Sequence, residues 1–166
     1  WKLALENTKS PTALILSRQN IKTLPAYGVD RIDAAAMAAR GAYIVTDTPG
    51  KPHVIMVASG SEVATLVEAA NLLGNRGIRS RVVSAPSEGL FRRQDVAYRH
   101  SVITPGVPVF CLTAGLPVTM LGFAGSEGKV FGLETFGYSA AYGILDQKFG
   151  FTGENIANEV KDFLKI

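Results

Sequence analysis

The side chain with the clearest chemical potential is Arg18, which follows an apolar run at residues 14–16 and then Ser17. We expect residues 13–16 to form a buried strand, which would place Arg18 at the strand end. A guanidinium there is costly to place unless it meets an anion, and its planar fork of donors matches phosphate or carboxylate oxygens. Two roles follow from residue type alone: an ion pair with a nearby Asp or Glu, or the binding of an anionic ligand.

A second candidate is the turn at residues 58–62, Ala-Ser-Gly-Ser-Glu, between an apolar run and an amphipathic one. Backbone N–H groups at such a helix start can hold an anion. The spacing matches neither G-x-G-x-x-G nor a P-loop, so it is no nucleotide fingerprint. A simpler expectation is a capping box, in which Ser59 caps the helix and Glu62 reaches back.

The sequence offers no further catalytic constellation. G-x-S-x-G is absent, and His53 and His100 have no evident nucleophile or acidic partner nearby in sequence. Cys111 is the lone cysteine, so it cannot form an internal disulfide and supplies too few ligands for a metal site. We expect it to be a core residue in a reduced, cytoplasmic setting, and we expect no catalytic residue and no metal ligand in this chain.

Composition describes an ordinary globular domain: 166 residues, 47% hydrophobic, 19% charged, with a net charge of +3. The basic patches lack the interleaved aromatic residues of nucleic-acid modules, so we expect solvated faces, with an anionic ligand left open. No apolar run approaches the ~20 residues that span a bilayer, and no signal peptide is recognisable. We therefore expect neither a nucleic-acid nor a membrane partner. The basic patches are Arg76, Arg79 and Arg81, then Arg92, Arg93, Arg99 and His100.

Strand and helix patterns alternate along the chain after an N-terminal helix end and a linker at residues 19–34. Such alternation predicts an α/β fold, a three-layer α/β/α sandwich with a mostly parallel sheet of about five strands. Thr152 and Phe151 supply a cap and an apolar staple for the last helix. The expected strands of the main domain are 42–47, 54–58, 81–84, 107–113 and 130–133, and the expected helices are 61–75, 92–100, 141–149 and 154–164.

Several segments, in this order, closely resemble the C-terminal part of transketolases. Each is weak alone, but together they cover essentially the whole chain. They are Ser17-Arg18-Gln19, Gly41-Ala42-Tyr43, the 58–63 turn, residues 82–86, Gln94-Asp95 with Tyr98-Arg99, and Phe136-Gly137-Tyr138-Ser139-Ala140.

The resemblance implies a thiamine diphosphate-dependent transferase that uses a divalent metal, Mg or Ca, to move two-carbon ketol units between sugar phosphates in the pentose phosphate pathway. In that family the cofactor lies between two upstream domains at a homodimer interface, so this chain would bind no cofactor and be inactive alone. Arg18 matches the family arginine that contacts the substrate phosphate. Residues 1–25 would be the tail of the upstream pyrimidine-binding domain with a linker, and residues 26–166 the C-terminal domain, here a piece of a longer protein.

One departure stands out: Thr113-Ala114-Gly115 replaces the Glu-Ala-Gly of many family members, which puts any role of that acid in doubt. Three alternatives remain open. The chain could be the end domain of another thiamine-dependent enzyme, such as a 2-oxoacid dehydrogenase or deoxyxylulose-phosphate synthase. It could be a free-standing anion- or nucleotide-binding module built on the 59–62 turn. It could also be an assembly domain in which strand 13–16 pairs at a sheet edge.

Overall fold

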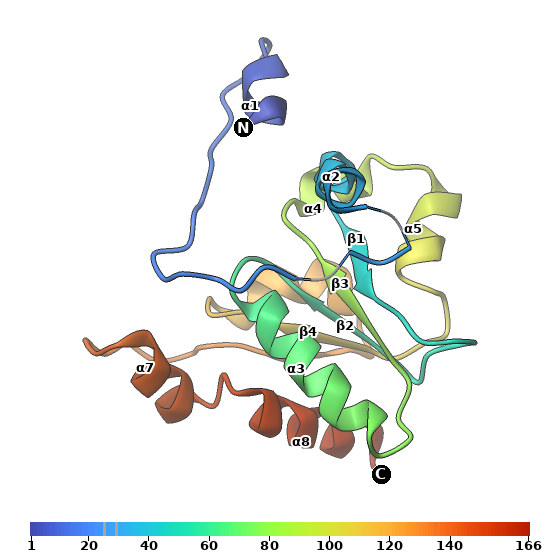
Figure 1. The fold of residues 1–166 in the computed structure, drawn as a ribbon, viewed down its shortest axis with the longest axis vertical. Helices are drawn as coiled ribbons and strands as arrows, with labels where there is room; N and C mark the ends of the chain where they lie inside the picture. Colours follow the sequence, from blue (N-terminus) through green and yellow to red (C-terminus); the bar gives the residue numbers. More distant parts are fainter. Residues whose placement is uncertain (25, 29) are drawn as a thin grey trace.

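The computed structural model describes residues 1–24, 26–28 and 30–166, and its centre is one mixed sheet (Figure 1). Within the described residues the sheet has five strands in the order β1-β3-β2-β4-β5. All pairs are parallel except β1 with β3, which are antiparallel. The α/β prediction with a mostly parallel sheet is confirmed. The strands are β1 (Tyr43–Thr46), β2 (Val54–Ala58), β3 (Ser80–Ser84), β4 (Val109–Leu112) and β5 (Lys129–Phe131).

Helices cover both faces of this sheet, which gives the expected three layers. One face packs against α3 (Glu62–Gly74) and α8 (Gly153–Leu164). The other packs against α4, α5, η2 and α6. Those four are α4 (Glu88–Arg92), α5 (Val96–Val102), η2 (Pro117–Met120) and α6 (Leu121–Ala124); the remaining elements are α1 (Lys2–Glu6), α2 (Arg31–Ala36), η1 (Met37–Arg40) and α7 (Tyr142–Phe149).

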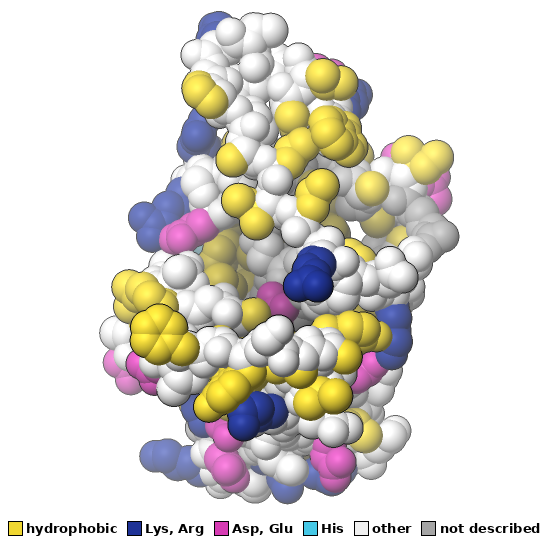
Figure 2. Space-filling view, turned by 90° about the vertical axis from the view of Figure 1, so that its left-hand side faces the viewer, with side chains coloured by type: hydrophobic (Ala, Val, Ile, Leu, Met, Phe, Trp, Pro, Cys, Tyr) yellow, Lys and Arg dark blue, Asp and Glu magenta, His cyan; other side chains and the backbone are white. Residues whose placement is uncertain are grey.

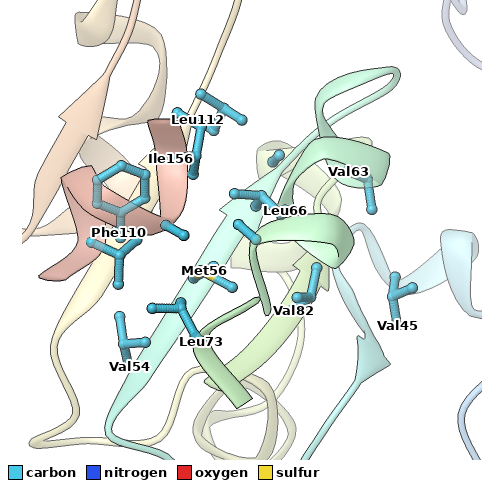
Figure 3. Close-up of a cluster of buried hydrophobic side chains, with 14 of the residues drawn as sticks. Val45, Val54, Met56, Val63, Leu66, Leu73, Val82, Phe110, Leu112 and Ile156 are labelled. Atoms are coloured by element: carbon cyan, nitrogen blue, oxygen red, sulfur yellow. The ribbon is translucent and has the colours of Figure 1, made fainter. Parts of the chain in front are cut away.

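The central strand β2 explains why its sequence is apolar without alternation. All of its residues are buried, because helices cover both of its faces. Met56 points into the cluster under α3 and α8, and the neighbouring Val57 into the cluster under α4 to α6. Figure 3 shows Met56 with Leu66 of α3 and Phe110 of β4 in the first cluster.

The two long helices follow their predicted patterns. In α3 the residues Val63, Leu66 and Leu73 share the buried stripe. The α8 cap is confirmed, because the Thr152 hydroxyl accepts a hydrogen bond from the Asn155 N–H at 3.3 Å. None of the described helices has the length and apolarity needed to cross a membrane.

The strand predicted at residues 13–16 is wrong. Residues 7–24 contain neither helix nor strand, and the side chains of Ile15 and Leu16 are 92% and 72% exposed. A strand needs a partner for its backbone hydrogen bonds, and no described strand pairs with this segment. Figure 1 instead shows it running in an extended path to α1, which stands away from the sheet.

Two helix starts also differ from the predictions. The capping box at Ser59 is wrong, because α3 begins after Ser61, whose hydroxyl donates to the Glu62 carboxylate at 2.7 Å. The helix expected at 92–100 begins late: α4 ends at Arg92, residues 93–95 are not helical, and α5 begins at Val96. Asp95 caps α5, accepting a hydrogen bond from the Tyr98 N–H at 2.7 Å.

The linker expected at residues 19–34 is partly wrong, because α2 begins inside it. Asp30 caps this helix by accepting hydrogen bonds from the N–H groups of Ile32 and Asp33. Pro25, the last residue of the expected upstream tail, lies outside the described residues.

Candidate functional site

Arg18 lies in the irregular segment and is exposed. Among the described residues it has no hydrogen-bond or ion-pair partner. The expected placement at the end of a buried strand is therefore wrong. The internal ion pair, one of the two roles open from sequence, is also not formed with any described residue. The guanidinium is instead available to an anion that arrives from outside.

The segment that carries Arg18 crosses the carboxyl edge of the sheet. Ser17 lies beside Gly60, where an added Cβ would stand 3.9 Å from the Ser17 hydroxyl oxygen. Gly60 turns the chain from β2 into α3 with φ +63°. The carboxyl ends of β2 to β5 all point to this edge, where open α/β sheets bind their ligands.

Two open clefts flank this crossing. One, of 420 Å³, lies between residues 21–24 with 26 and 27, β1 and the Gly60 turn, and is mainly apolar. The other, of 320 Å³, lies between residues 19–22, the start of α3, and α7 with the start of α8. Lys22 and Glu68 of α3 both line this second cleft and form an ion pair. The hydrogen bond from Lys22 to Glu68, and the charge of that carboxylate, raise the pKa of Lys22.

The second cleft has an acidic lining. Glu62, Glu68 and Asp146 face it, and the basic residue lining it, Lys22, is already paired with Glu68. Partial burial raises the pKa of Asp146. A phosphate group is repelled by such a lining, so Arg18 is the better anion partner at this edge.

The 59–62 turn fits an anion cradle poorly. Glu62 lies in the first turn of α3 and is held by Ser61, so a carboxylate already complements the helix dipole. An incoming phosphate would meet this negative charge. The structure therefore gives the anion-binding module no support.

The other singled-out residues have structural places. Nδ1 of His53 accepts the Arg79 N–H at 3.3 Å at the amino edge of the sheet, and His100 is exposed on α5. Cys111 is fully buried, and burial raises the pKa of its thiol to about 12. Thr113 accepts the Gly115 N–H at 3.1 Å, which shapes the turn after β4.

One basic residue was wrongly expected on a solvated face. Arg81 is largely buried, with 11% of its side chain exposed, and is paired with Asp47, with 2.8 Å between Nη2 and Oδ2. Its position inside β3, between the buried residues Ser80 and Val82, was the available signal. In the part of the chain that the structure describes, no three His, Cys, Asp or Glu side chains form a group able to hold a metal.

The family model described as the transketolase-like TK C-terminal domain matches residues 41–152, which span the whole sheet. The chain belongs to the transketolase family. Transketolase 1 of Vibrio vulnificus (strain YJ016) is 41% identical over 165 residues, and Transketolase 1 of Escherichia coli (strain K12) is 39% identical. Each match covers 99% of this chain and 24% of the relative, so the chain spans about a quarter of these transketolases.

Solved transketolases share the fold. The transketolase of Leishmania mexicana superposes with a TM-score of 0.86 at 36% identity, covering 99% of this chain and 23% of that one. A Pichia stipitis transketolase in complex with sedoheptulose 7-phosphate superposes with a TM-score of 0.74 at 31% identity, covering 89% and 20%. The predicted resemblance and the predicted transketolase C-terminal domain are both confirmed.

Proposed function

We propose that this chain works as the C-terminal domain of a transketolase that transfers two-carbon ketol units between sugar phosphates in the pentose phosphate pathway. The observation that carries the proposal is the similarity of nearly the whole chain to one quarter of a transketolase, at 41% identity over 99% of the chain. Complexes of the Pichia stipitis relative with sedoheptulose 7-phosphate and xylulose 5-phosphate support sugar phosphates as the substrate class. A cytoplasmic homodimer is the assembly we propose for the parent enzyme.

Arg18 is our candidate for the substrate contact, as the side chain that binds the phosphate of the sugar. Its support is its exposure at the carboxyl edge of the sheet and its lack of a partner among the described residues. A guanidinium binds phosphate through two parallel N–H···O bonds, so it fixes orientation as well as charge. Ser17 beside Gly60 and the pairing of Lys22 with Glu68 hold the segment against the domain.

Thiamine diphosphate and its divalent metal, Mg or Ca, belong in this proposal to the parts of the parent enzyme that precede this domain. The bound cofactor supplies the carbanion chemistry of ketol transfer. The described residues of this chain do not fit the divalent metal, since they offer no group of three acidic, His or Cys ligands. We therefore assign no chemical step to this chain, whose part is to bind and orient the phosphate.

We further propose that residues 1–25 belong to the upstream pyrimidine-binding domain and its linker, and residues 26–166 to the C-terminal domain. In support, α1 has no buried residue and the family match begins at residue 41. Alone, the chain would then lack both cofactor and bases and be inactive.

Ketol transfer from a ketose phosphate to an aldose phosphate tests the proposal, measured for the parent enzyme and for residues 1–166 alone, each with thiamine diphosphate and Mg²⁺. We expect turnover by the parent and none by the fragment. A parent without ketol transfer would overturn the proposed activity. Turnover by the fragment would overturn its dependence on the preceding domains.

A further inference from the structure

The longest unbroken exposed stretch beyond the N-terminal segment is residues 134–144, eleven residues between β5 and the first turn of α7. It carries four large apolar side chains. Phe136 is 96% exposed, more than any other large hydrophobic residue of the described chain. The other three are Tyr138, Tyr142 and Ile144, exposed by 58–61%. Exposed hydrophobic groups gathered on one segment mark an interaction surface.

The segment is held to the domain by few contacts. Just before it, the Leu133 N–H donates to Gly115 O at 2.9 Å. Within it, the Tyr138 ring packs on Phe149, with 5.7 Å between ring centroids, and the Lys148 ammonium lies 4.3 Å from the centre of the same ring. Residues 134–140 form no backbone hydrogen bond with any other described residue. Their N–H and C=O groups are therefore open to a partner, as are the apolar side chains.

This segment shares a face with the crossing that carries Arg18. Residues 19–22 and Tyr142 line the same 320 Å³ cleft, so the two stretches lie on either side of it. Apolar side chains are exposed on the Arg18 stretch too, at Ile15 and Leu16. Figure 2 shows this side of the molecule, with apolar side chains scattered over it.

We propose that residues 134–144 are a docking surface for the part of the transketolase that precedes this domain. The inference rests on the proposed function. Transketolase relatives are about four times as long as this chain, and the matching model is that of a C-terminal domain, so the parent enzyme of the proposed function has a large preceding part that could cover this surface.

A photo-crosslinker at position 136 tests the occupant in the intact parent enzyme. Phe136 is replaced by p-benzoylphenylalanine, and the matched control carries it at Val96, which is 53% exposed. Val96 begins α5, which Figure 1 shows on the opposite side of the molecule from α7. We expect the 136 variant, and not the control, to crosslink to peptides that precede this domain. Crosslinks to residues 1–166 of a second copy, or none at all, would overturn the proposal.

Amide hydrogen exchange provides a second measurement. It is made on the unmodified parent enzyme, so a folding defect of a variant cannot produce the expected protection. In the unmodified parent we expect the amides of residues 134–140 to exchange at least tenfold more slowly than those of Gly50 and Lys51, an exposed turn. Phe136→Asp should abolish this protection and Val96→Asp should retain it. Because the Phe136 side chain touches little of its own domain, its replacement leaves that fold intact. Equal exchange of both segments in the unmodified parent would overturn the docking surface.

The two proposals fail separately. Ketol transfer by the unmodified parent tests the proposed function, while crosslinking and exchange test the surface and need no turnover. An active parent with an unprotected 134–140 segment would remove only the docking surface.

Discussion

Arg81 and Asp47 form a largely buried ion pair that joins three elements of the fold. The Nη2 atom of Arg81 in β3 lies 2.8 Å from Oδ2 of Asp47, the residue after β1, and Nε donates to the same oxygen at 3.0 Å. The other terminal nitrogen donates to the carbonyl oxygens of Ser101 and Val102 at the end of α5, and to the Thr104 hydroxyl. The guanidinium is therefore satisfied on every side, and it holds the antiparallel edge strand to the domain.

Arg81→Ala should destabilise the domain by about 3–5 kcal/mol, because it leaves the largely buried Asp47 carboxylate without its partner. The matched control is Arg79→Ala, whose exposed side chain donates, among the described residues, only to Lys51 O, and which should cost less than about 1 kcal/mol. Urea unfolding of both variants checks this. Equal losses would show that the pair contributes nothing beyond an exposed contact.

Two glycines should respond to alanine with opposite signs. Gly41 has φ +86°, and a Cβ there would stand 2.2 Å from the Phe91 backbone nitrogen. Gly41→Ala should therefore cost more than about 2 kcal/mol, from backbone strain and the clash with α4. Gly74, in the last turn of α3, has open space around it, so Gly74→Ala should stabilise by roughly 0.5 kcal/mol. Thermal unfolding compares them, and a neutral Gly41→Ala would contradict the packing of η1 against α4.

Cys111 should make the domain less stable at alkaline pH. Burial raises the pKa of its thiol from 9.0 to about 12, so the unfolded chain ionises first. The contribution of the protonated Cys111 thiol to the free energy of unfolding is complete below pH 9. It is lost as the pH rises toward 12, by up to about 1.4 kcal/mol per pH unit. The gap in unfolding free energy between the native chain and Cys111→Ala should narrow over that window. A gap independent of pH between 8 and 10.5 would contradict a thiol protected by burial.

The strands of the sheet were predictable because their signals are local. An unbroken apolar run such as β2 indicates a strand that is covered on both faces. The Thr152 cap of α8 depends only on residues three positions apart. The same apolar signal failed at residues 13–16, since nothing in the sequence says whether a strand finds a partner. Ile15 is exposed because no described strand offers one.

The side-chain type of Arg18 predicts an anion partner, which remains a prediction. The place of its neighbour Ser17 beside the Gly60 turn could not be predicted, because it depends on a contact between segments about 40 residues apart. The Arg81 pair was missed for the same reason, because Asp47 and Arg81 lie 34 positions apart. Residue type predicts chemistry, whereas long-range pairing decides which groups meet.

The most direct test of the account is ketol transfer by the parent enzyme carrying Arg18→Ala, with phosphorylated and unphosphorylated acceptors compared. Arg76→Ala, another exposed arginine, is the matched control. We expect a loss of roughly 1.5–3 kcal/mol in transition-state stabilisation, confined to phosphorylated acceptors, which is the scale of a hydrogen bond to a charged group. Equal losses for both acceptors, or none, would contradict Arg18 as the phosphate contact.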